Sequence, residues 1–282
     1  MIMSVFVPGH VTGFFNIENH ESKLKNGSCG VGFLLTKGVM TTVIESDNFE
    51  FEVNLGDDTI VCEVLRILNL DNSNFKIIQD IQLPIGAGFG TSAASALSLT
   101  LALNDFLNLG YSKELCGQIA HMAEVNLGAG LGDVIAQTGS GLVLRTKSGA
   151  PGIGEIKSFN QDVYIAYKTF GPIETSEIIT DANYKKIISE VGLKYLELFE
   201  EKPSLDNFLI FSKKFSCETG LMSPEVKKQI EYFESIDDVL GSSMAMLGNT
   251  VFALSYNEDT FKKLNIEELH IDKLNNNGIV YD

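Results

Sequence analysis

One stretch of the sequence, residues 84–107 (PIGAGFGTSAASALSLTLALNDFL), limits the possible folds more than any other. Gly86, Gly88 and Gly90 alternate just before Thr91 and Ser92. Glycines at this density let a backbone turn tightly and bring its N–H groups close to a ligand. No proline or glycine then interrupts the chain until Gly110, which predicts a helix starting near Gly90. Because the first N–H groups of a helix lack partners and its dipole is positive there, the stretch predicts an anion site.

The glycine spacing differs from the two commonest phosphate loops. The pattern GxxxxGK[ST] needs a lysine before the hydroxyl residue, whereas here Gly90 precedes Thr91. The pattern G-x-G-x-x-G fails because the third glycine comes one residue early. An alternative is that the small residues only allow a helix to pack closely on a sheet. The hydroxyls of Thr91 and Ser92 favour a ligand, because they stand where a phosphate-bound cation would lie.

Composition narrows the class of ligand. The 282 residues suit one large or two modest domains, and 44% hydrophobic with 21% charged residues describe a globular protein. A net charge of −16 argues against nucleic acid and anionic membranes as partners. An anionic substrate must then be held by local cations, helix ends or a metal. The chain has only two arginines, Arg66 and Arg145.

The cysteines and the N-terminus point to the cytoplasm. The four cysteines show no CxxC or Cys/His spacing, so neither zinc nor a disulfide framework is expected. The start MIMSVFVPGH lacks a basic region and predicts a strand rather than a signal peptide. No apolar run reaches membrane-spanning length.

Hydrophobic periodicity predicts mixed strands and helices. The expected strands are 3–7 (ended by Pro8-Gly9), 32–35, 41–45, 49–53, 76–83, 140–146, 162–168 and a final edge strand, and the expected helices are 59–70, 113–127, 190–201, 206–217 and one starting at Pro224. Residues 147–157, rich in glycine and proline, are expected to link two domains, 1–152 and 153–282. Residues 241–256 are expected to form a small-residue loop followed by a strand, with a buried hairpin as the alternative.

Three segments together carry a family resemblance. P-x-x-x-G-x-G-[ST]-S-A-A at 84–94 resembles the second motif of the GHMP kinases, the superfamily of galactokinase, homoserine kinase and mevalonate kinase. VPGHVTGFF at 7–15 with GSCGVGF at 27–33 resembles the first motif, and 241–256 resembles the third. Many members have Lys or Arg after Pro-Gly, where this chain has His10. Pro-Gly-His is similar to the archaeal pantoate kinase branch, although taken alone His10 could be a surface or turn histidine.

The resemblance implies an α+β GHMP kinase fold. An N-terminal domain like domain 2 of ribosomal protein S5 would join a ferredoxin-like C-terminal domain, with ATP and substrate bound between them. The implied reaction is ATP-dependent phosphorylation of (R)-pantoate to (R)-4-phosphopantoate. The implied ATP-binding residues are Pro84, Gly86, Ala87, Gly88, Phe89, Gly90, Thr91, Ser92 and Ala93.

The segment 113–133 carries the implied chemistry. Ser112 is a good N-cap, and His121 and Glu124 are neighbours on a helix that ends in GAGLGD. The resemblance implies that Ser92 and Glu124 hold Mg²⁺ and that Asp133 faces the substrate hydroxyl, which phosphoryl transfer requires. The alternatives are an exposed polar helix face for the His/Glu pair and an N-cap of helix 134–137 for Asp133.

Substrate binding is expected to involve Arg145. Its planar guanidinium suits the single carboxylate of pantoate, although an arginine ending an apolar strand is often solvated. The implied substrate residues are His10, Ser28, His121, Arg145 and Thr175, the last of which could equally cap a helix. The rival functions are another kinase of the superfamily, a non-catalytic ligand sensor, and a related decarboxylase. The sequence leaves open whether the chain forms a homodimer.

Overall fold

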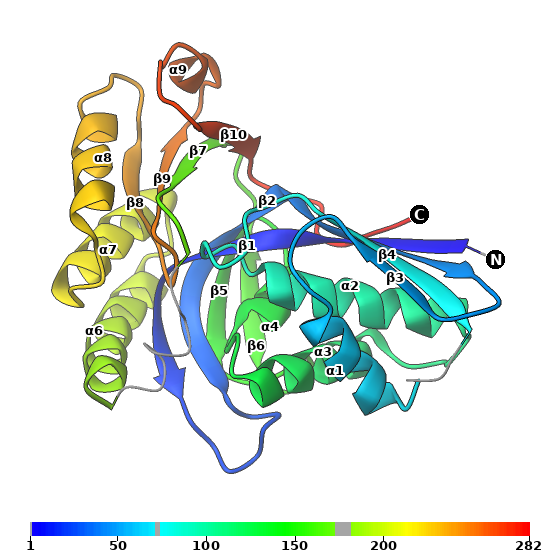
Figure 1. Ribbon diagram of the computed structural model, residues 1–282. Helices are drawn as coiled ribbons and strands as arrows, with labels where there is room; N and C mark the ends of the chain where they lie inside the picture. Colours follow the sequence, from blue (N-terminus) through cyan, green and yellow to red (C-terminus); the bar gives the residue numbers. More distant parts are fainter. Residues whose placement is uncertain (1, 71–73, 173–181) are drawn as a thin grey trace.

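The computed structural model describes residues 2–70, 74–172 and 182–282, and its elements form an α+β fold (Figure 1). The strands are β1 (Ile2–Glu18), β2 (Gly27–Glu45), β3 (Glu50–Val53), β4 (Phe75–Ile81), β5 (Leu142–Lys147), β6 (Glu155–Phe159), β7 (Tyr164–Thr169), β8 (Gly241–Ala245), β9 (Thr250–Ser255), β10 (His270–Lys273) and β11 (Val280–Tyr281). The helices are α1 (Thr59–Leu68), α2 (Thr91–Phe106), α3 (Lys113–Leu127), α4 (Asp133–Gln137), α6 (Ala182–Glu201), α7 (Leu205–Glu218), α8 (Pro224–Glu234) and α9 (Asp259–Lys262). Thr175 lies outside the described residues.

The strands form two sheets. A seven-stranded sheet has the order β11-β1-β2-β4-β3, with β5 paired to β2 and β6 to β5. A four-stranded sheet has the order β10-β7-β9-β8. The long strand β2 pairs with β5 near its start and with β4 near its end, while β1 follows it along most of its length. β11 lies at the edge of the larger sheet, as expected for the C-terminal strand.

β1 is longer than the sequence suggested. It was expected to end at Pro8-Gly9, and the strand after it was expected to start only at Gly32, but β1 continues to Glu18 and β2 starts at Gly27. The register of the β1–β2 pair shifts between Pro8 and His10. Such an irregularity accommodates a residue without an N–H, so the ladder resumes after proline. As a result, His10 lies inside a sheet rather than in a turn.

The helices α1 to α4 cover one face of the larger sheet (Figure 1). α2 begins at Thr91, which confirms the expected helix, and it is buried on nearly every side. α3 also has the expected bounds, with Ser112 Oγ accepting a hydrogen bond from the N–H of Leu115. Leu115 and Leu127, near the two ends of this helix, are each 40% exposed. The small residues of α3, Cys116, Ala120 and Ala123, make the contact with α2 instead.

Residues 147–157 do not form a linker. β6 pairs with β5 as a hairpin, and Ser148 and Ala150 in the connecting turn are buried. The boundary expected after residue 152 therefore falls inside this hairpin. The chain passes from one sheet to the other between Phe159 and Tyr164, so we propose that any division into domains lies there.

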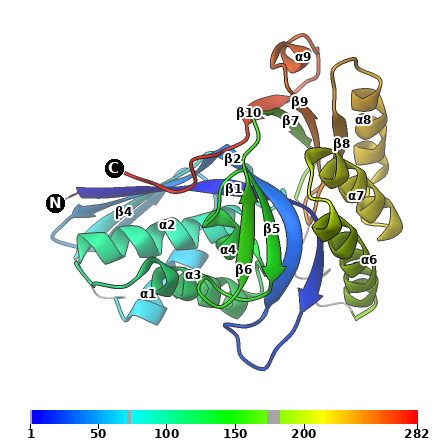
Figure 2. The ribbon, with the colours of Figure 1, turned by 180° about the vertical axis from the view of Figure 1, so that it is seen from behind.

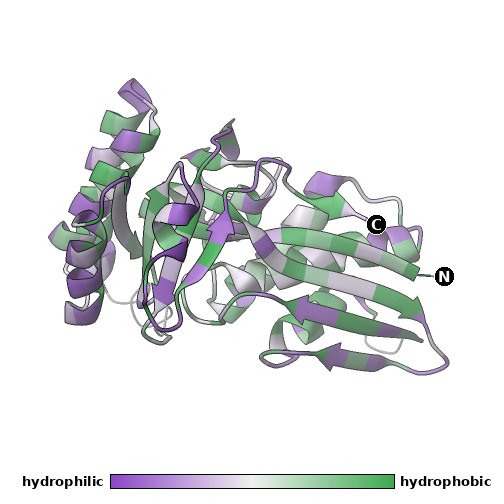
Figure 3. Cartoon of the chain, turned by 90° about the horizontal axis from the view of Figure 1, so that it is seen from above, coloured by the Kyte–Doolittle hydropathy of each residue, from purple (hydrophilic) through white to green (hydrophobic). Residues whose placement is uncertain are grey.

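The smaller sheet carries the helices α7 and α8, whereas α6 packs against α7 and against β1 of the larger sheet (Figure 2). α8 starts at Pro224 with Ser223 as its N-cap, as expected. Residues 241–256 form the β8–β9 hairpin, so the alternative interpretation was correct. In Figure 3 the strand that leads from the N-terminus is predominantly hydrophobic, whereas the helices at the far end alternate between hydrophilic and hydrophobic residues. This alternation lets those helices cover the sheet with one face only.

One hydrophobic core joins the two sheets. The ring of Phe33 on β2 lies 5.1 Å from that of Phe252 on β9 and 5.9 Å from that of Phe208 on α7. Phe14 on β1 meets Phe199 on α6 at 5.9 Å. These contacts fix the relative position of the two sheets. No helix in the described part of the chain is both long and apolar enough to cross a membrane.

Candidate active site

A cavity of about 600 Å³ opens where the two sheets meet the start of α2. It is lined by Thr12, Phe15, Ser28, Ile85, Gly86, Gly88, Phe89, Gly90, Thr91, Ser92, Glu124, Leu127, Gly128, Ala129, Gly130, Leu131, Gly132, Asp133, Arg145, Pro172, Met246 and Leu247. Segments from both halves of the sequence therefore build one site. Its volume suits a nucleotide phosphate chain with a small substrate.

The glycine-rich loop uses conformations that favour glycine. Gly86, Gly88 and Gly90 have φ values of 69°, 85° and 59°. A Cβ on Gly88 would lie 3.0 Å from the carbonyl oxygen of Met246, so a side chain there would push the loop from the β8–β9 turn. Gly90 is the N-cap of α2 and supplies no side-chain cap. The first N–H groups of α2 are thereby left for an anion in the cavity.

Hydrogen bonds and a ring contact hold the glycine loop against the protein interior. Thr250 Oγ1 donates to the carbonyl oxygen of Ala87 at 2.8 Å, and the N–H of His10 donates to that of Phe89 at 2.9 Å. The Phe89 ring meets Tyr167 at 4.9 Å. Of the expected ATP residues, Pro84, Ala87 and Ala93 do not line the cavity, and the other six do. Ala87 and Ala93 are buried supports of the loop.

The β8–β9 turn forms the part of the cavity wall next to the glycine loop. Met246 and Leu247 line the cavity, and Leu247 has a φ of 61°. A Cβ on Gly248 would lie 2.1 Å from the carbonyl of Ala87, so only glycine lets the turn touch the loop this closely. The segment that resembles the third motif is thus in direct contact with the segment that resembles the second.

Ser92 and Glu124 form a buried oxygen pair. Ser92 Oγ donates to Glu124 Oε1 at 2.5 Å, and Glu124 is 2% exposed. Burial raises the pKa of Glu124 to about 7, although the hydrogen bond from Ser92 partly opposes the shift. Hydroxyl and carboxylate oxygens are ligands that Mg²⁺ accepts, so the pair fits this ion. No group of three His, Cys, Asp or Glu suited to a metal occurs in the described ranges, which leaves the remaining positions to phosphate oxygens and water.

Asp133 is the first residue of α4 and packs directly against the glycine loop, since a Cβ on Gly90 would lie 3.1 Å from the Cβ of Asp133. The N-cap is Gly132, so Asp133 is not the cap of this helix. Its side chain is 27% exposed, and its Oδ1 lies 2.7 Å from His10 Nδ1. Burial alone would raise the pKa of Asp133, but the hydrogen bond from His10 and the charge of Arg145 outweigh it and lower the pKa. Asp133 is therefore an ionised carboxylate facing the cavity.

Arg145 is buried at the end of the cavity near β1. It is 1% exposed, and its Nε donates to the carbonyl oxygen of Ser28 at 3.2 Å. One terminal nitrogen lies 3.4 Å from His10 Nε2 and 3.5 Å from Thr12 Oγ1. The solvated strand end that was the alternative for Arg145 is therefore excluded. A buried guanidinium that still lines a cavity is suited to bind a carboxylate.

The two histidines expected at the substrate lie outside the cavity wall. His10 is fully buried behind Asp133. His121 is buried on α3, with its Nε2 at 3.1 Å from the carbonyl oxygen of Lys23. The exposed helix face considered for His121 and Glu124 was wrong, because both side chains are buried. Ser28 does line the cavity.

The sequence did not reveal Thr12 and Phe15, which also line the cavity. Both follow Pro8-Gly9, where β1 was expected to have ended. The available signal was the alternation of side chains along a strand, which would have placed Thr12 on the same face as His10 had the strand been continued.

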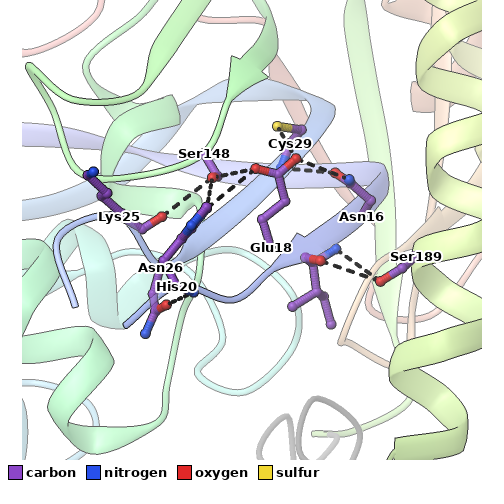
Figure 4. Close-up of polar contacts among 9 residues, drawn as sticks. Asn16, Glu18, His20, Lys25, Asn26, Cys29, Ser148 and Ser189 are labelled. Carbon is purple, nitrogen blue, oxygen red and sulfur yellow. Dashed lines mark hydrogen bonds and ion pairs between the residues drawn. The ribbon is translucent and has the colours of Figure 1, made fainter. Parts of the chain in front are cut away.

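A polar cluster supports the strands behind the cavity (Figure 4). Ser148 Oγ donates to Glu18 Oε2 at 2.6 Å, and the N–H of Cys29 donates to Asn16 Oδ1 at 3.2 Å. Burial would raise the pKa of Glu18, but hydrogen bonds from Ser148, Cys29 and Asn16 lower it overall. The cluster ties the end of β1 and the start of β2 to the turn after β5, and so fixes Ser28 beside Arg145.

Comparisons with known proteins identify the fold and the family. Residues 59–141 match the family model described as GHMP kinases N terminal domain. A solved structure described as a phosphotransferase related to CoA biosynthesis pathway has a TM-score of 0.86 and 28% identity, covering 100% of this chain and 99% of that one. The α+β fold is thus that of the GHMP kinases.

Two curated relatives show which family within the GHMP kinases the chain belongs to. The pantoate kinase of Methanocaldococcus jannaschii is 37% identical over 93% of this chain and 96% of its own. That of Thermococcus kodakarensis is 34% identical over 93% of this chain and 90% of its own. The chain belongs to the pantoate kinase family.

Proposed function

We propose that this protein transfers the γ-phosphoryl group of ATP to the C4 hydroxyl of (R)-pantoate, giving (R)-4-phosphopantoate for coenzyme A synthesis. The observation that supports it best is the cavity itself, in which an uncapped helix start, the Ser92–Glu124 pair, Asp133 and buried Arg145 all line one space. The similarity to two pantoate kinases supports the choice of substrate.

The glycine loop binds the phosphates of ATP. N–H groups at the start of α2 point their partial positive charge into the cavity, and Gly86, Gly88 and Gly90 let the phosphates approach the backbone. A net charge of −16 makes this local arrangement necessary, because the protein as a whole repels the nucleotide.

Ser92 and Glu124 would hold Mg²⁺ beside these phosphates. When bound, the ion neutralises charge on the phosphoryl oxygens during transfer. Glu124 has to lose its proton to act as a ligand, and the pKa of about 7 means that ion binding and deprotonation are coupled.

Asp133 receives the proton of the substrate hydroxyl. Its Oδ1 is occupied by His10, and within the described chain no hydrogen bond reaches Oδ2. Oδ2 takes the proton from the C4 hydroxyl as that oxygen forms its bond to the γ-phosphorus and ADP leaves. A lowered pKa keeps Asp133 ionised and ready for this step.

Arg145 binds the carboxylate of pantoate. Its guanidinium lies beside Thr12 and Ser28, whose hydroxyls are available to the same substrate. The apolar side chains of Phe15 and Leu131 line the cavity as well and suit the two methyl groups of pantoate. This end of the cavity therefore matches both the charge and the apolar part of the substrate.

The test is an ATP-consumption assay with Mg²⁺ on pantoate, pantothenate, mevalonate, homoserine and galactose. Turnover with pantoate alone supports the proposal. Turnover with another alcohol would keep the phosphotransferase chemistry and reject pantoate as the substrate. No turnover on any compound, with ATP still bound, would favour a ligand sensor instead.

A further inference from the structure

His10 connects the two ends of the reacting site. Its Nδ1 lies 2.7 Å from Asp133 Oδ1, and its Nε2 lies 3.4 Å from a terminal nitrogen of Arg145. His10 is 0% exposed and does not line the cavity, so its side chain reaches the site only through these two residues. The three side chains come from positions far apart in the sequence, on β1, α4 and β5.

The partners determine which ring nitrogen carries the proton. Arginine has five donors and no acceptor, so Nε2 must accept its hydrogen bond and carry no proton. Nδ1 then bears the hydrogen and donates it to the Asp133 carboxylate. Burial lowers the pKa of His10, and Asp133 only partly opposes this, so the imidazole is neutral near pH 7.

The surrounding backbone leaves space for this arrangement. A Cβ on Gly32 would lie 2.3 Å from His10 Nε2, and one on Gly30 would lie 2.5 Å from a terminal nitrogen of Arg145. A Cβ on Gly132 would lie 2.8 Å from Arg145 Nε. Glycine at these three positions is what allows a histidine and an arginine to be packed side by side in the interior.

We infer that His10 is a positioning residue that acts as a neutral bridge between Asp133 and Arg145. It fixes Oδ1 of Asp133, so that Oδ2 is the oxygen presented to the substrate hydroxyl. It also fixes the guanidinium that anchors the other end of the substrate, and thereby sets the separation of the two groups. The inference rests on the proposed function, which assigns Asp133 to the substrate hydroxyl and Arg145 to the substrate carboxylate.

Two substitutions separate the two contacts. In His10→Asn the amide nitrogen can take the place of Nδ1 and donate to Asp133, but nothing reaches Arg145. In His10→Gln the amide oxygen can take the place of Nε2 and accept from Arg145, but the donor to Asp133 is lost. We expect His10→Asn to keep kcat and raise KM for pantoate, and His10→Gln to keep KM and lose about 10²-fold in kcat, the usual effect of a misplaced reacting group.

A merely structural role would give the same kinetic profile in both variants, and that result would overturn the inference. So would unchanged kcat and KM in both. ATP affinity serves as the internal control, because neither contact involves the glycine loop side chains.

A second measurement needs neither activity nor a variant of His10. Nitrogen-15 correlation spectra of the imidazoles report the tautomer, and substituting His20, His121 and His270 in turn leaves the signals of His10 identified, since the chain has four histidines. A neutral ring protonated at Nδ1 supports the bridge. An imidazolium, or a ring protonated at Nε2, overturns it. If the wild-type protein does not phosphorylate pantoate, the proposed function is wrong. The imidazole spectra would still test the bridge between Asp133 and Arg145, because they do not depend on activity.

Discussion

Ser92 Oγ and Glu124 Oε1 are 2.5 Å apart and come from different helices, α2 and α3. Hydrogen bonds from Ser92 and from the backbone of Gly130 both favour the ionised form of Glu124, but burial outweighs them and raises the pKa to about 7. A buried carboxylate without a cation is costly, which makes the Ser92–Glu124 pair sensitive to both protons and Mg²⁺.

The first prediction concerns the stability of the metal-free protein. The folded-state pKa of about 7 exceeds the ordinary value of 4.5, so the folded state binds the extra proton. Stability from this group is present below about pH 4.5 and is lost as pH rises to about 7. The loss is at most about 3 kcal/mol, from 1.36 kcal/mol per pKa unit. In EDTA, Glu124→Gln should gain Tm over the wild type above about pH 7 and match it below about pH 4.5.

Glu63→Gln is the control with the opposite sign. A hydrogen bond from Arg66 lowers the pKa of Glu63 to about 2, so Glu63→Gln should lose Tm at neutral pH rather than gain it. Added Mg²⁺ should raise the Tm of the wild type and leave that of Glu124→Gln unchanged. Parallel pH curves for wild type and Glu124→Gln would contradict the raised pKa.

The second prediction tests the anchor for the substrate carboxylate. Arg145→Lys keeps the charge but loses the two-pronged geometry of the guanidinium. We expect KM for pantoate to rise about tenfold or more, which corresponds to about 1.4 kcal/mol, while ATP affinity is unchanged. Steady-state kinetics with pantoate as the varied substrate measure this.

The other arginine of the chain provides the matched control. Arg66 lies on the surface of α1 and pairs with Glu63, so Arg66→Lys should leave KM unchanged. An equal rise in KM for both variants would show that the effect at Arg145 is not specific to the site.

Local signals in the sequence predicted the glycine loop and the helices around it. α3 has the predicted bounds because Ser112 caps its start and Gly128 takes the left-handed conformation at its end. α2 starts at Thr91 because Gly90 allows the turn that precedes it. Both are properties of a few adjacent residues, which is why they can be read without the fold.

The partners of buried polar residues could not be read in this way. His10 and Asp133 are 123 positions apart, and their contact depends on the irregularity that carries β1 past Pro8. The burial of Arg145 depends on Gly30 and Gly132, which adjoin it only in the folded chain. A pattern of alternation cannot predict a buried arginine, because the space for it is supplied by other segments.

The third prediction separates backbone strain from contact at the glycine loop. Gly88→Ala imposes a side chain at φ 85° with its Cβ 3.0 Å from the Met246 carbonyl oxygen. Gly110→Ala imposes one at φ 72° with no heavy atom within 4 Å. Each should cost about 1–2 kcal/mol of stability from the left-handed conformation. Only Gly88→Ala should also weaken ATP binding, by about tenfold.

Thermal unfolding and calorimetric titration with ATP measure the two effects. Normal ATP affinity in Gly88→Ala would mean that the loop does not approach the phosphates through its backbone. Equal loss of affinity in Gly110→Ala would mean that general destabilisation, rather than the loop, controls binding.

The fourth prediction concerns the proton acceptor. Asp133→Asn has the same shape but cannot accept the hydroxyl proton, so turnover with pantoate should fall by about 10²–10⁴-fold, the usual contribution of a general base. ATP should still bind, because Asp133 is not part of the glycine loop. Single-turnover kinetics with saturating ATP measure the chemical step directly.

Asp47→Asn is the matched control, since Asp47 is an exposed residue in the turn between β2 and β3. It should retain full turnover and the same Tm as the wild type. Near-normal turnover in Asp133→Asn would remove this residue from the proton transfer, and the hydroxyl would then have to lose its proton to a phosphate oxygen. The bridge through His10 would in that case orient the substrate without preparing a base, because Oδ1 of Asp133 would still be held at 2.7 Å from Nδ1.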